Sequence, residues 1–243
     1  MFLSEKIKKK GLGKLMDFNK PKCVIVSGGL LEDDAYHREI LREAEMVICA
    51  DSGARHALRL GITPHYVVGD FDSLAPAESQ ELKKREVKFI KYPQEKDYAD
   101  TFYALGKALE LGYQQIALVA CLGGRFDHAF SNIMLLALPQ ARNLDIRILE
   151  PYQEIFLVKP KMKILGQKGE TVSLLPLSEE VTGITTSGLY YQVPEGKFTM
   201  GFPLGVSNVF VHEVVELSVE KGLLLAIHPQ KEKSGNFRFL CTP

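Results

Sequence analysis

The chain has 243 residues, of which 46% are hydrophobic and 25% are charged, and its 30 Lys and Arg residues balance its 30 Asp and Glu residues. This length allows one large globular domain or two modest ones. Because a zero net charge creates no basic field that would attract nucleic acid, we expect a small-molecule substrate and no nucleic-acid partner.

The apolar residues are not arranged for a membrane or for secretion. No apolar run approaches the ~20 residues that span a bilayer, and the first residues lack the apolar core of a signal peptide. The four cysteines, Cys23, Cys49, Cys121 and Cys241, form no C-x-x-C pair, and three of them lie in apolar runs typical of buried strands. We therefore expect a cytoplasmic protein with reduced thiols and no membrane partner.

Residues 1–21 precede the first apolar run and form an N-terminal extension. The extension contains five lysines, Lys6, Lys8, Lys9, Lys10 and Lys14. A basic helix for membranes or RNA is one interpretation, and a solvated extension is the one that we favour.

Residues 22–150 repeat a short apolar run followed by a stretch of helical period. The apolar runs are 23–26, 46–50, 66–68, 87–90, 116–120 and 144–149, and the helical stretches are 35–44, 54–61, 77–86, 99–112 and 128–138. Alternating strands and helices predict an α/β domain with a mainly parallel sheet and helices on both faces. Ligands of such sheets bind outside the carboxyl ends of the strands.

Residues 151–243 lose the helical period. Short β-rich runs at 154–159, 171–177, 183–193, 209–220 and 223–228 are separated by Gly, Pro and Lys. This pattern predicts a smaller all-β domain, a sandwich or a curled sheet.

Polar residues follow four of the predicted strands, and a parallel sheet would bring them to one edge. These residues are Ser27-Gly28-Gly29, Asp51-Ser52-Gly53, Gly69-Asp70-Phe71-Asp72-Ser73 and Gly123-Gly124-Arg125-Phe126-Asp127-His128. If the segment is extended, Asp70 and Asp72 point to the same side, as carboxylates that share a hard cation such as magnesium would. The alternative is an ordinary turn.

A second acidic motif, Lys96-Asp97-Tyr98-Ala99-Asp100, stands where a helix is expected to begin. We expect Asp97 near the N-cap and Asp100 in the first turn, which is a capping arrangement. The functional alternative places Asp100 with Asp70 and Asp72 around a metal and Lys96 on a phosphate.

The run Gly123-Gly124-Arg125 leads from a buried strand into a helix. Glycines let backbone approach a phosphate at a helix N-terminus, and Arg125 offers a planar fork to phosphate oxygens. Asp127 and His128 are expected at the N-cap and first turn; the alternative is a tight turn with Arg125 in solvent. No Walker A motif or G-x-G-x-x-G is present. An aspartyl-phosphate phosphatase, with Asp70 as nucleophile, ranks low because no second paired-aspartate motif follows.

Taken in order, these motifs resemble the thiamine pyrophosphokinase family. The matching stretches are 50–54, 69–73, 95–100 and 123–128 with Asn132, and in the β-rich part Thr186-Ser187-Gly188-Leu189-Tyr190-Tyr191 and Ser207-Asn208. The resemblance spans about residues 22–230. Its specificity comes from the order and spacing of five or six motifs.

The resemblance implies that the hydroxyl of thiamine attacks the β-phosphorus of ATP and that AMP leaves. It implies that Asp70, Asp72 and Asp100 bind Mg²⁺. The nucleotide site would contain Gly28, Gly29, Asp51, Ser52, Gly53, Lys96, Asp97, Gly123, Gly124, Arg125, His128 and Asn132. Asp127 would either orient the substrate hydroxyl or bind the metal assembly.

The β-rich domain, 151–243, is implied to bind thiamine. Tyr191 would stack on the pyrimidine, Ser207 and Asn208 would hydrogen-bond its polar edges, and Thr186, Ser187 and Gly188 would complete the site. A cationic thiazolium suits an aromatic face. The resemblance further implies a homodimer in which the first domain of one subunit and the second domain of its partner share each active site.

The chain departs from the family pattern at Ala99, Ser52, Ala120-Cys121 and Tyr191, where members often carry Thr, Gly, Gly-Ala and Trp. These departures keep two alternatives open. One is pyrophosphoryl transfer to another hydroxymethyl heterocycle. The other is a non-catalytic regulator that binds nucleotide or thiamine.

Overall fold

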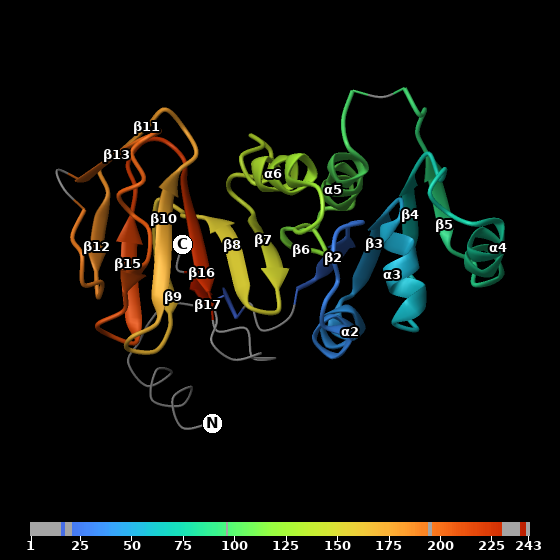
Figure 1. Cartoon of the computed structure of the whole chain (residues 1–243), viewed down its shortest axis with the longest axis horizontal. Coiled ribbons are helices and arrows are strands. Elements are labelled where there is room, and N and C mark those ends of the chain that lie inside the picture. The colour runs from blue at the N-terminus through green and yellow to red at the C-terminus, as the bar shows by residue number, and fades with distance from the viewer. Residues whose placement is uncertain (1–15, 18–20, 96, 194–195, 230–238, 242–243) are drawn as a thin grey trace. The chain divides into compact units, whose positions relative to one another are not determined.

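The computed structural model describes residues 16–17, 21–95, 97–193, 196–229 and 239–241 (Figure 1). The chain divides into two compact units. The first, here called the α/β unit, contains the described residues of 21–157 and 225–229. The second, here called the β unit, contains those of 158–224 together with strands β1 (Met16–Asp17) and β17 (Phe239–Cys241). The five lysines of the predicted extension lie outside the described residues.

The α/β unit is built on a parallel sheet that uses all six predicted apolar runs. The strands stand in the order β7-β6-β2-β3-β4-β5. Their bounds are β2 (Cys23–Val26), β3 (Met46–Ala50), β4 (Tyr66–Gly69), β5 (Lys88–Lys91), β6 (Gln115–Val119) and β7 (Asp145–Glu150). In β2, β3, β4 and β6 the sequence is almost continuously apolar because helices bury both faces of a parallel sheet, whereas the edge strand β5 begins and ends with exposed lysines.

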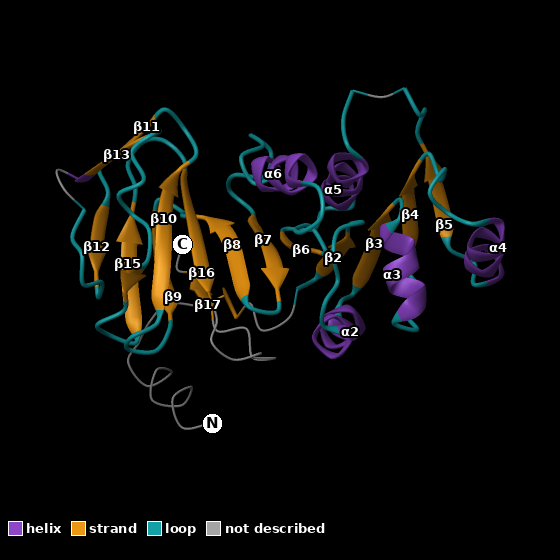
Figure 2. Ribbon diagram, in the orientation of Figure 1, coloured by secondary structure: helices purple, strands orange, loops and turns teal. Residues whose placement is uncertain are grey.

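The predicted helical stretches form the helices of the α/β unit. They are α2 (Asp34–Glu43), α3 (Gly53–Arg59), α4 (Pro76–Lys84), α5 (Asp100–Glu110) and α6 (Phe126–Leu135). Figure 2 shows α5 and α6 on one face of the sheet and α2 and α3 on the other. The fold prediction of a mainly parallel sheet with helices on both faces is confirmed.

Two apolar runs that we placed in the β-rich domain extend the first sheet instead. β8 (Gln153–Leu157) pairs antiparallel with β7, and β16 (Leu224–Pro229) pairs antiparallel with β8. The changeover between the units falls at 157/158. Whether 1–21, 22–150 and 151–243 fold as separate domains stays a prediction.

A group of charged side chains is buried at this antiparallel end of the sheet. Arg147 and Glu154 are each 1% exposed, and Arg147 Nη1 lies 3.3 Å from Glu154 Oε2. Arg147 Nε donates to Asp145 Oδ1 at 2.8 Å, and His228 Nδ1 lies 3.3 Å from Glu154 Oε1. The guanidinium also lies over the ring of Phe156, 4.9 Å from its centroid. Each buried charge thus has a partner, as burial requires.

The β unit contains a sheet of order β1-β17-β9-β15-β12, a β11–β13 pair and a β10–β14 pair. The further bounds are β9 (Lys161–Leu165), β10 (Thr171–Pro176), β11 (Glu180–Thr182), β12 (Thr185–Ser187), β13 (Lys197–Thr199), β14 (Asn208–Val209) and β15 (Val214–Ser218). Burial alternates along β9, β10 and β15, as expected for strands with one face on a core. The predicted antiparallel β-rich region is confirmed.

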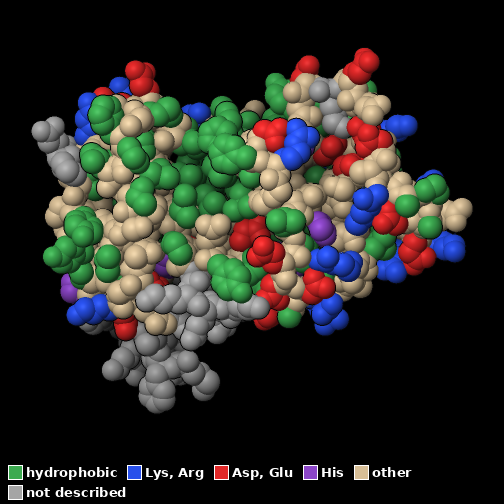
Figure 3. All heavy atoms as spheres, in the orientation of Figure 1, with side chains coloured by type: hydrophobic (Ala, Val, Ile, Leu, Met, Phe, Trp, Pro, Cys, Tyr) green, Lys and Arg blue, Asp and Glu red, His purple; other side chains and the backbone are tan. Residues whose placement is uncertain are grey.

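The state of three cysteines and the distribution of surface charge match the expectations of reduced thiols and of no basic field. Cys23, Cys49 and Cys121 are free and buried. Among the described residues, no helix is long and apolar enough to cross a membrane. On the face shown in Figure 3, acidic and basic side chains alternate over the helices of the α/β unit rather than forming a patch of one sign.

Candidate active site

The polar loops that follow β2, β3, β4 and β6 meet at one edge of the parallel sheet. A Cβ added to Gly28 would lie 2.0 Å from Ser52 Oγ, so the loops after β2 and β3 touch. The Gly29 amide donates to Ala120 O at 2.8 Å, and the Asp51 amide donates to Val68 O at 2.8 Å. Adjacent parallel strands place their carboxyl ends together, and the predicted convergence of these loops is confirmed.

Three carboxylates form the centre of this edge, and we call Asp51, Asp70 and Asp72 the aspartate cluster. One oxygen atom from each lies within 4.8 Å of the other two. Asp51 Oδ2 accepts a hydrogen bond from Ser73 Oγ. Asp51 Oδ1 is buried and has no hydrogen-bond partner among the described residues. A buried carboxylate oxygen without a donor is costly unless a cation or another donor satisfies it.

A turn brings Asp70 and Asp72 together, and our premise of an extended segment is wrong. Phe71 has a φ of 69°, which breaks the strand immediately after Gly69. The Asp72 amide donates to Asp70 Oδ1 at 3.1 Å, and Gln94 Nε2 donates to Asp72 Oδ2 at 2.9 Å. The turn that stood as the alternative interpretation is therefore what gathers the carboxylates.

Asp100 approaches the cluster from the first turn of α5. A Cβ added to Gly69 would lie 3.0 Å from Asp100 Oδ1 and 3.3 Å from Asp51 Oδ1, so both oxygens face the same point of the β4 backbone. The N-cap of α5 is Ala99, and Asp97 precedes the helix and is exposed. Asp97 thus lies two residues before the N-cap, and Asp100 lies in the first turn as predicted. Lys96 lies outside the described residues.

The donor set of the aspartate cluster fits a hard divalent cation. Its ligands are carboxylate oxygens, which magnesium and calcium prefer. The carboxylates of the cluster also repel one another, and a bound cation would offset that repulsion. Two unit charges 4 Å apart repel by about 1 kcal/mol in water and by about 4 kcal/mol at the effective dielectric of a protein surface. The structure groups Asp51, which we assigned to the nucleotide, with Asp70 and Asp72, and Asp100 stands beside them.

The loop after β6 is shaped by positive φ angles and opens at the start of α6. Ala120, Gly123 and Gly124 have φ values of 52°, 79° and 67°, and the space beside the Gly124 Cα is open. Arg125 is the N-cap of α6 and makes no side-chain cap hydrogen bond. Arg125 therefore does not cap the first amides of α6, although the Asp127 carboxylate accepts a hydrogen bond from the His128 amide. An anion at this helix N-terminus would be favoured by the helix dipole and would lie close to the Asp127 carboxylate. Asp127 lies inside the first turn, so its predicted position at the N-cap is wrong.

Arg125 and Asp127 pair with each other on the surface of α6. Arg125 Nη2 lies 2.5 Å from Asp127 Oδ2, and Nε donates to Oδ1 at 3.1 Å. This hydrogen bonding lowers the pKa of the Asp127 carboxyl and raises that of the guanidinium. A phosphate that binds Arg125 must therefore share it with Asp127 or displace the carboxylate. His128 follows on the same turn and is exposed.

Several side chains support the loops from behind. Asn132 is buried, and its Nδ2 donates to Cys121 O at 2.9 Å, which fixes the start of the glycine loop. Ser27 Oγ and Thr101 Oγ1 are 2.7 Å apart and buried, and they join the β2 loop to α5. The sequence analysis gave no role to Ser73, Gln94 or Thr101. Ser73 stands within a quoted motif, whereas nothing in the sequence pattern marks Gln94 or Thr101.

In the β unit, Asn208 holds the backbone around Tyr191. Asn208 Oδ1 accepts from the Tyr191 amide at 2.9 Å and from the Val209 amide at 2.9 Å, and Nδ2 donates to Tyr191 O at 2.7 Å. Tyr191 itself is 59% exposed, with its ring edge-on to Tyr190. The observed role of Asn208 is to position Tyr191. Hydrogen bonding of Asn208 to a substrate stays a prediction.

The remaining predicted substrate residues lie on β12 and in two turns of the β unit. Thr186 and Ser187 belong to β12, which pairs with β15. Thr186 Oγ1 is buried and lacks a hydrogen-bond partner among the described residues. Gly188 has a φ of 86°, and a Cβ there would lie 2.5 Å from Val214 O. Ser207 has a φ of 56°, and its amide donates to Ser173 Oγ at 3.0 Å.

Comparison with known proteins gives matches along both units. The family model of the thiamin pyrophosphokinase catalytic domain matches residues 37–148, and that of the vitamin B1 binding domain matches residues 157–224. Thiamine pyrophosphokinase from Bacillus subtilis (strain 168) is 32% identical over 188 residues, which cover 76% of this chain and 87% of that protein.

Solved structures give the same result. The crystal structure of thiamine pyrophosphokinase from Bacillus subtilis superposes with a TM-score of 0.76 at 28% identity, covering 86% of this chain and 99% of that one. Thiamin pyrophosphokinase from Geobacillus thermodenitrificans superposes with a TM-score of 0.73 at 27% identity, covering 86% and 97%. The two domain matches, the sequence identity and the shared fold lead to one conclusion: this chain belongs to the thiamin pyrophosphokinase family.

Proposed function

We propose that this chain transfers the pyrophosphoryl group of ATP to the hydroxyl of thiamine, giving thiamine diphosphate and AMP. The observation that carries the proposal is that the match to the family's catalytic domain, residues 37–148, contains the whole aspartate cluster. Pyrophosphoryl transfer asks the protein for an aligned nucleophile and for neutralisation of a crowded phosphate chain. A carboxylate cluster beside open glycine loops meets that need.

We infer that the cation is Mg²⁺ and that Asp51, Asp70 and Asp72 hold it, with Asp100 beside them. Bound magnesium would neutralise phosphate charge and orient the phosphate chain. The loops at Gly28-Gly29 and Gly123-Gly124 would bring backbone close to the phosphates, and Arg125 would bind phosphate oxygens. Asp127 stays a candidate for orienting the hydroxyl or binding the metal assembly.

The β unit is proposed to bind thiamine. The vitamin B1 binding family model covers residues 157–224, and these include Thr186, Tyr191 and Asn208. The exposed ring of Tyr191 supports stacking on the ligand, because its backbone is clamped while its face remains accessible. A homodimer with shared active sites and a cytoplasmic location complete the proposal.

The test is one incubation with ATP, thiamine and Mg²⁺, followed by chromatography. Equal amounts of AMP and thiamine diphosphate, both absent with EDTA, are expected. Asp70→Asn and Asp72→Asn should each lower kcat/KM at least about 100-fold, because each removes a metal ligand. Asp34→Asn, which breaks a surface ion pair with Arg59, is the control.

The outcomes of this assay separate the candidate functions. Full activity in both metal-ligand variants would overturn the cation assignment. AMP and pyrophosphate without thiamine diphosphate would mean that water accepts the pyrophosphoryl group and that thiamine is not the acceptor. A repeat with other hydroxymethyl heterocycles would then identify the acceptor. Binding of ATP or thiamine by folded protein without any AMP would indicate a regulator and would refute the proposed activity.

A further inference from the structure

A pocket of about 200 Å³ opens at the point where the parallel sheet changes direction. From β2 the chain builds the sheet one way through β3, β4 and β5, and it then continues on the other side of β2 with β6 and β7. The loops after β2 and β6 carry helices on opposite faces of the sheet (Figure 2). They line the pocket through Leu30 and through Leu122 and Gly123. In open α/β sheets this topological switch point is where ligands bind.

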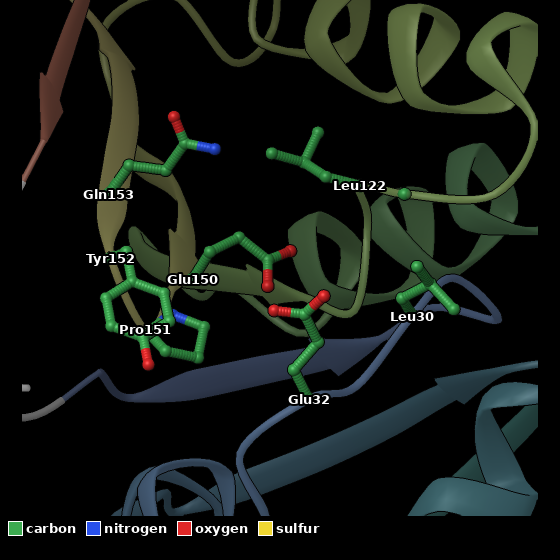
Figure 4. Close-up of a pocket in the computed structure, with 8 residues that line it drawn as sticks. Leu30, Glu32, Leu122, Glu150, Pro151, Tyr152 and Gln153 are labelled. Carbon is green, nitrogen blue, oxygen red and sulfur yellow. The ribbon is translucent and has the colours of Figure 1, made fainter.

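The pocket combines an apolar wall with hydrogen-bond acceptors. Figure 4 shows Leu122 facing Gln153 across the opening, with the Glu150 and Glu32 carboxylates turned toward each other below them. Two facing carboxylates repel a phosphate. They favour a flat apolar group that carries N–H donors. A nucleobase with an exocyclic amine is such a group, whereas the phosphate chain of a nucleotide is not.

Glu150 is held so that its carboxylate faces the pocket. Its Oε1 accepts a hydrogen bond from the Cys121 amide at 3.2 Å, in the glycine loop after β6. Its Oε2 lies 3.9 Å from Nε2 of His37, a fully buried side chain whose Nε2 has no hydrogen-bond partner among the described residues. The contacts with the Cys121 amide and with His37 orient the Glu150 carboxylate before any ligand binds, which lowers the entropic cost of binding.

The distance to the aspartate cluster suits a nucleotide laid along the strand ends. Asp51 follows β3 and Glu150 ends β7, so three strand spacings, roughly 14 Å, separate their strands. The Gly28-Gly29 turn lies between them and touches both Ser52 and the β6 loop. An extended nucleoside triphosphate with its base in the pocket would carry its phosphates past these glycines toward the aspartates.

We propose that this pocket is the base subsite for the nucleotide donor and that Glu150 accepts a hydrogen bond from the exocyclic amine of a 6-aminopurine. Gln153 offers an amide that matches the amine and ring nitrogen of the same edge, as glutamine does with adenine. The inference rests on the proposed function for the identity of the ligand as a nucleotide. It makes Glu150 and Gln153 the residues that determine which purine is used.

The test is calorimetric titration of the whole chain with AMP and with IMP, which lacks the amine. A hydrogen bond to a charged acceptor corresponds to a preference for AMP of roughly 10- to 100-fold. Glu150→Gln should remove most of that preference, because the amide can also donate to the oxygen of IMP. Leu122→Trp, which fills the pocket, should weaken both ligands. Glu39→Gln removes an equal charge from an exposed position of α2 and should leave the preference unchanged.

We would also measure kcat/KM for ATP and for ITP with thiamine as the acceptor, so that a failure of the base subsite can be distinguished from a failure of the proposed function. An equal affinity of the wild type for AMP and IMP, or full AMP affinity in folded Leu122→Trp, would overturn the subsite. So would an undiminished preference in Glu150→Gln. If that variant fails to fold, the wild type and Leu122→Trp decide. Base selectivity that depends on Glu150, with no thiamine diphosphate formed, would support the subsite and refute the pyrophosphokinase proposal.

Discussion

Replacing Arg147 with Met should destabilise the α/β unit strongly. Arg147 and Glu154 are each 1% exposed, so the substitution removes the guanidinium partner of the buried Glu154, which keeps its contact with His228, and also that of Asp145. Removing one member of a buried ion pair costs about 3–5 kcal/mol. Methionine fills much of the space of the arginine side chain beside Phe156, so the loss reports the charge, including the contact of the guanidinium with the ring, rather than a cavity. Urea unfolding followed by circular dichroism measures the change.

Two further variants test whether the loss of stability in Arg147→Met comes from leaving a buried charge unpaired. The double variant Arg147→Met/Glu154→Leu removes both charges, and it should recover most of the lost stability, since apolar replacement of a whole buried pair is often neutral. Arg55→Met breaks an ion pair whose side chains are 49% and 31% exposed and should cost at most about 1 kcal/mol. Amide hydrogen exchange over residues 145–157 localises the effect. A loss in Arg147→Met no larger than in Arg55→Met would refute the reasoning.

Three other predictions concern packing and thiol chemistry. Gly53→Ala should lower the free energy of unfolding by about 1–3 kcal/mol, since its Cβ would lie 2.1 Å from Val26 O. The control, Gly106→Ala, has open space beside it and should raise the free energy of unfolding by up to about 1 kcal/mol. Equal effects of the two substitutions in urea unfolding would contradict the packing argument. Asn208→Ala should cost about 1–3 kcal/mol and raise the KM for thiamine more than it lowers kcat, because the Tyr191 backbone loses its clamp; an unchanged KM would argue against the positioning role. The Cys23 thiol, whose pKa burial raises to about 12, should resist Ellman's reagent at pH 8 until the protein unfolds, as measured by mass spectrometry of its peptide; rapid labelling of folded protein would show that the β2 core opens.

The sequence alone was sufficient for the six parallel strands and the helices of the α/β unit. Each of the six apolar runs forms a strand and each helical stretch forms a helix, because burial on both faces of a parallel sheet and on one stripe of a helix imposes different periods. The glycines and aspartates directly after those runs also predicted that the loops meet at one edge, where the candidate site lies, since parallel strands end at a common edge. These features are local, and local sequence encodes them.

The tertiary structure decided which residues share that edge and how. Asp51 joins Asp70 and Asp72 because β3 lies beside β4. The turn between Asp70 and Asp72 depends on the left-handed backbone conformation of Phe71, which the identity of the residue does not predict. The pairing of Arg125 with Asp127 joined two side chains to which the sequence analysis gave separate roles.

The sequence also did not predict which strands pair with one another outside the parallel part of the sheet. β8 and β16 are short apolar-rich strands, as are β9 and β15 of the β unit, yet they join the first sheet. Pairing between strands far apart in the chain depends on which edges meet during folding and on the burial that each pairing gains. A run of apolar residues specifies that it will be buried and how its faces alternate, but it does not specify its neighbour.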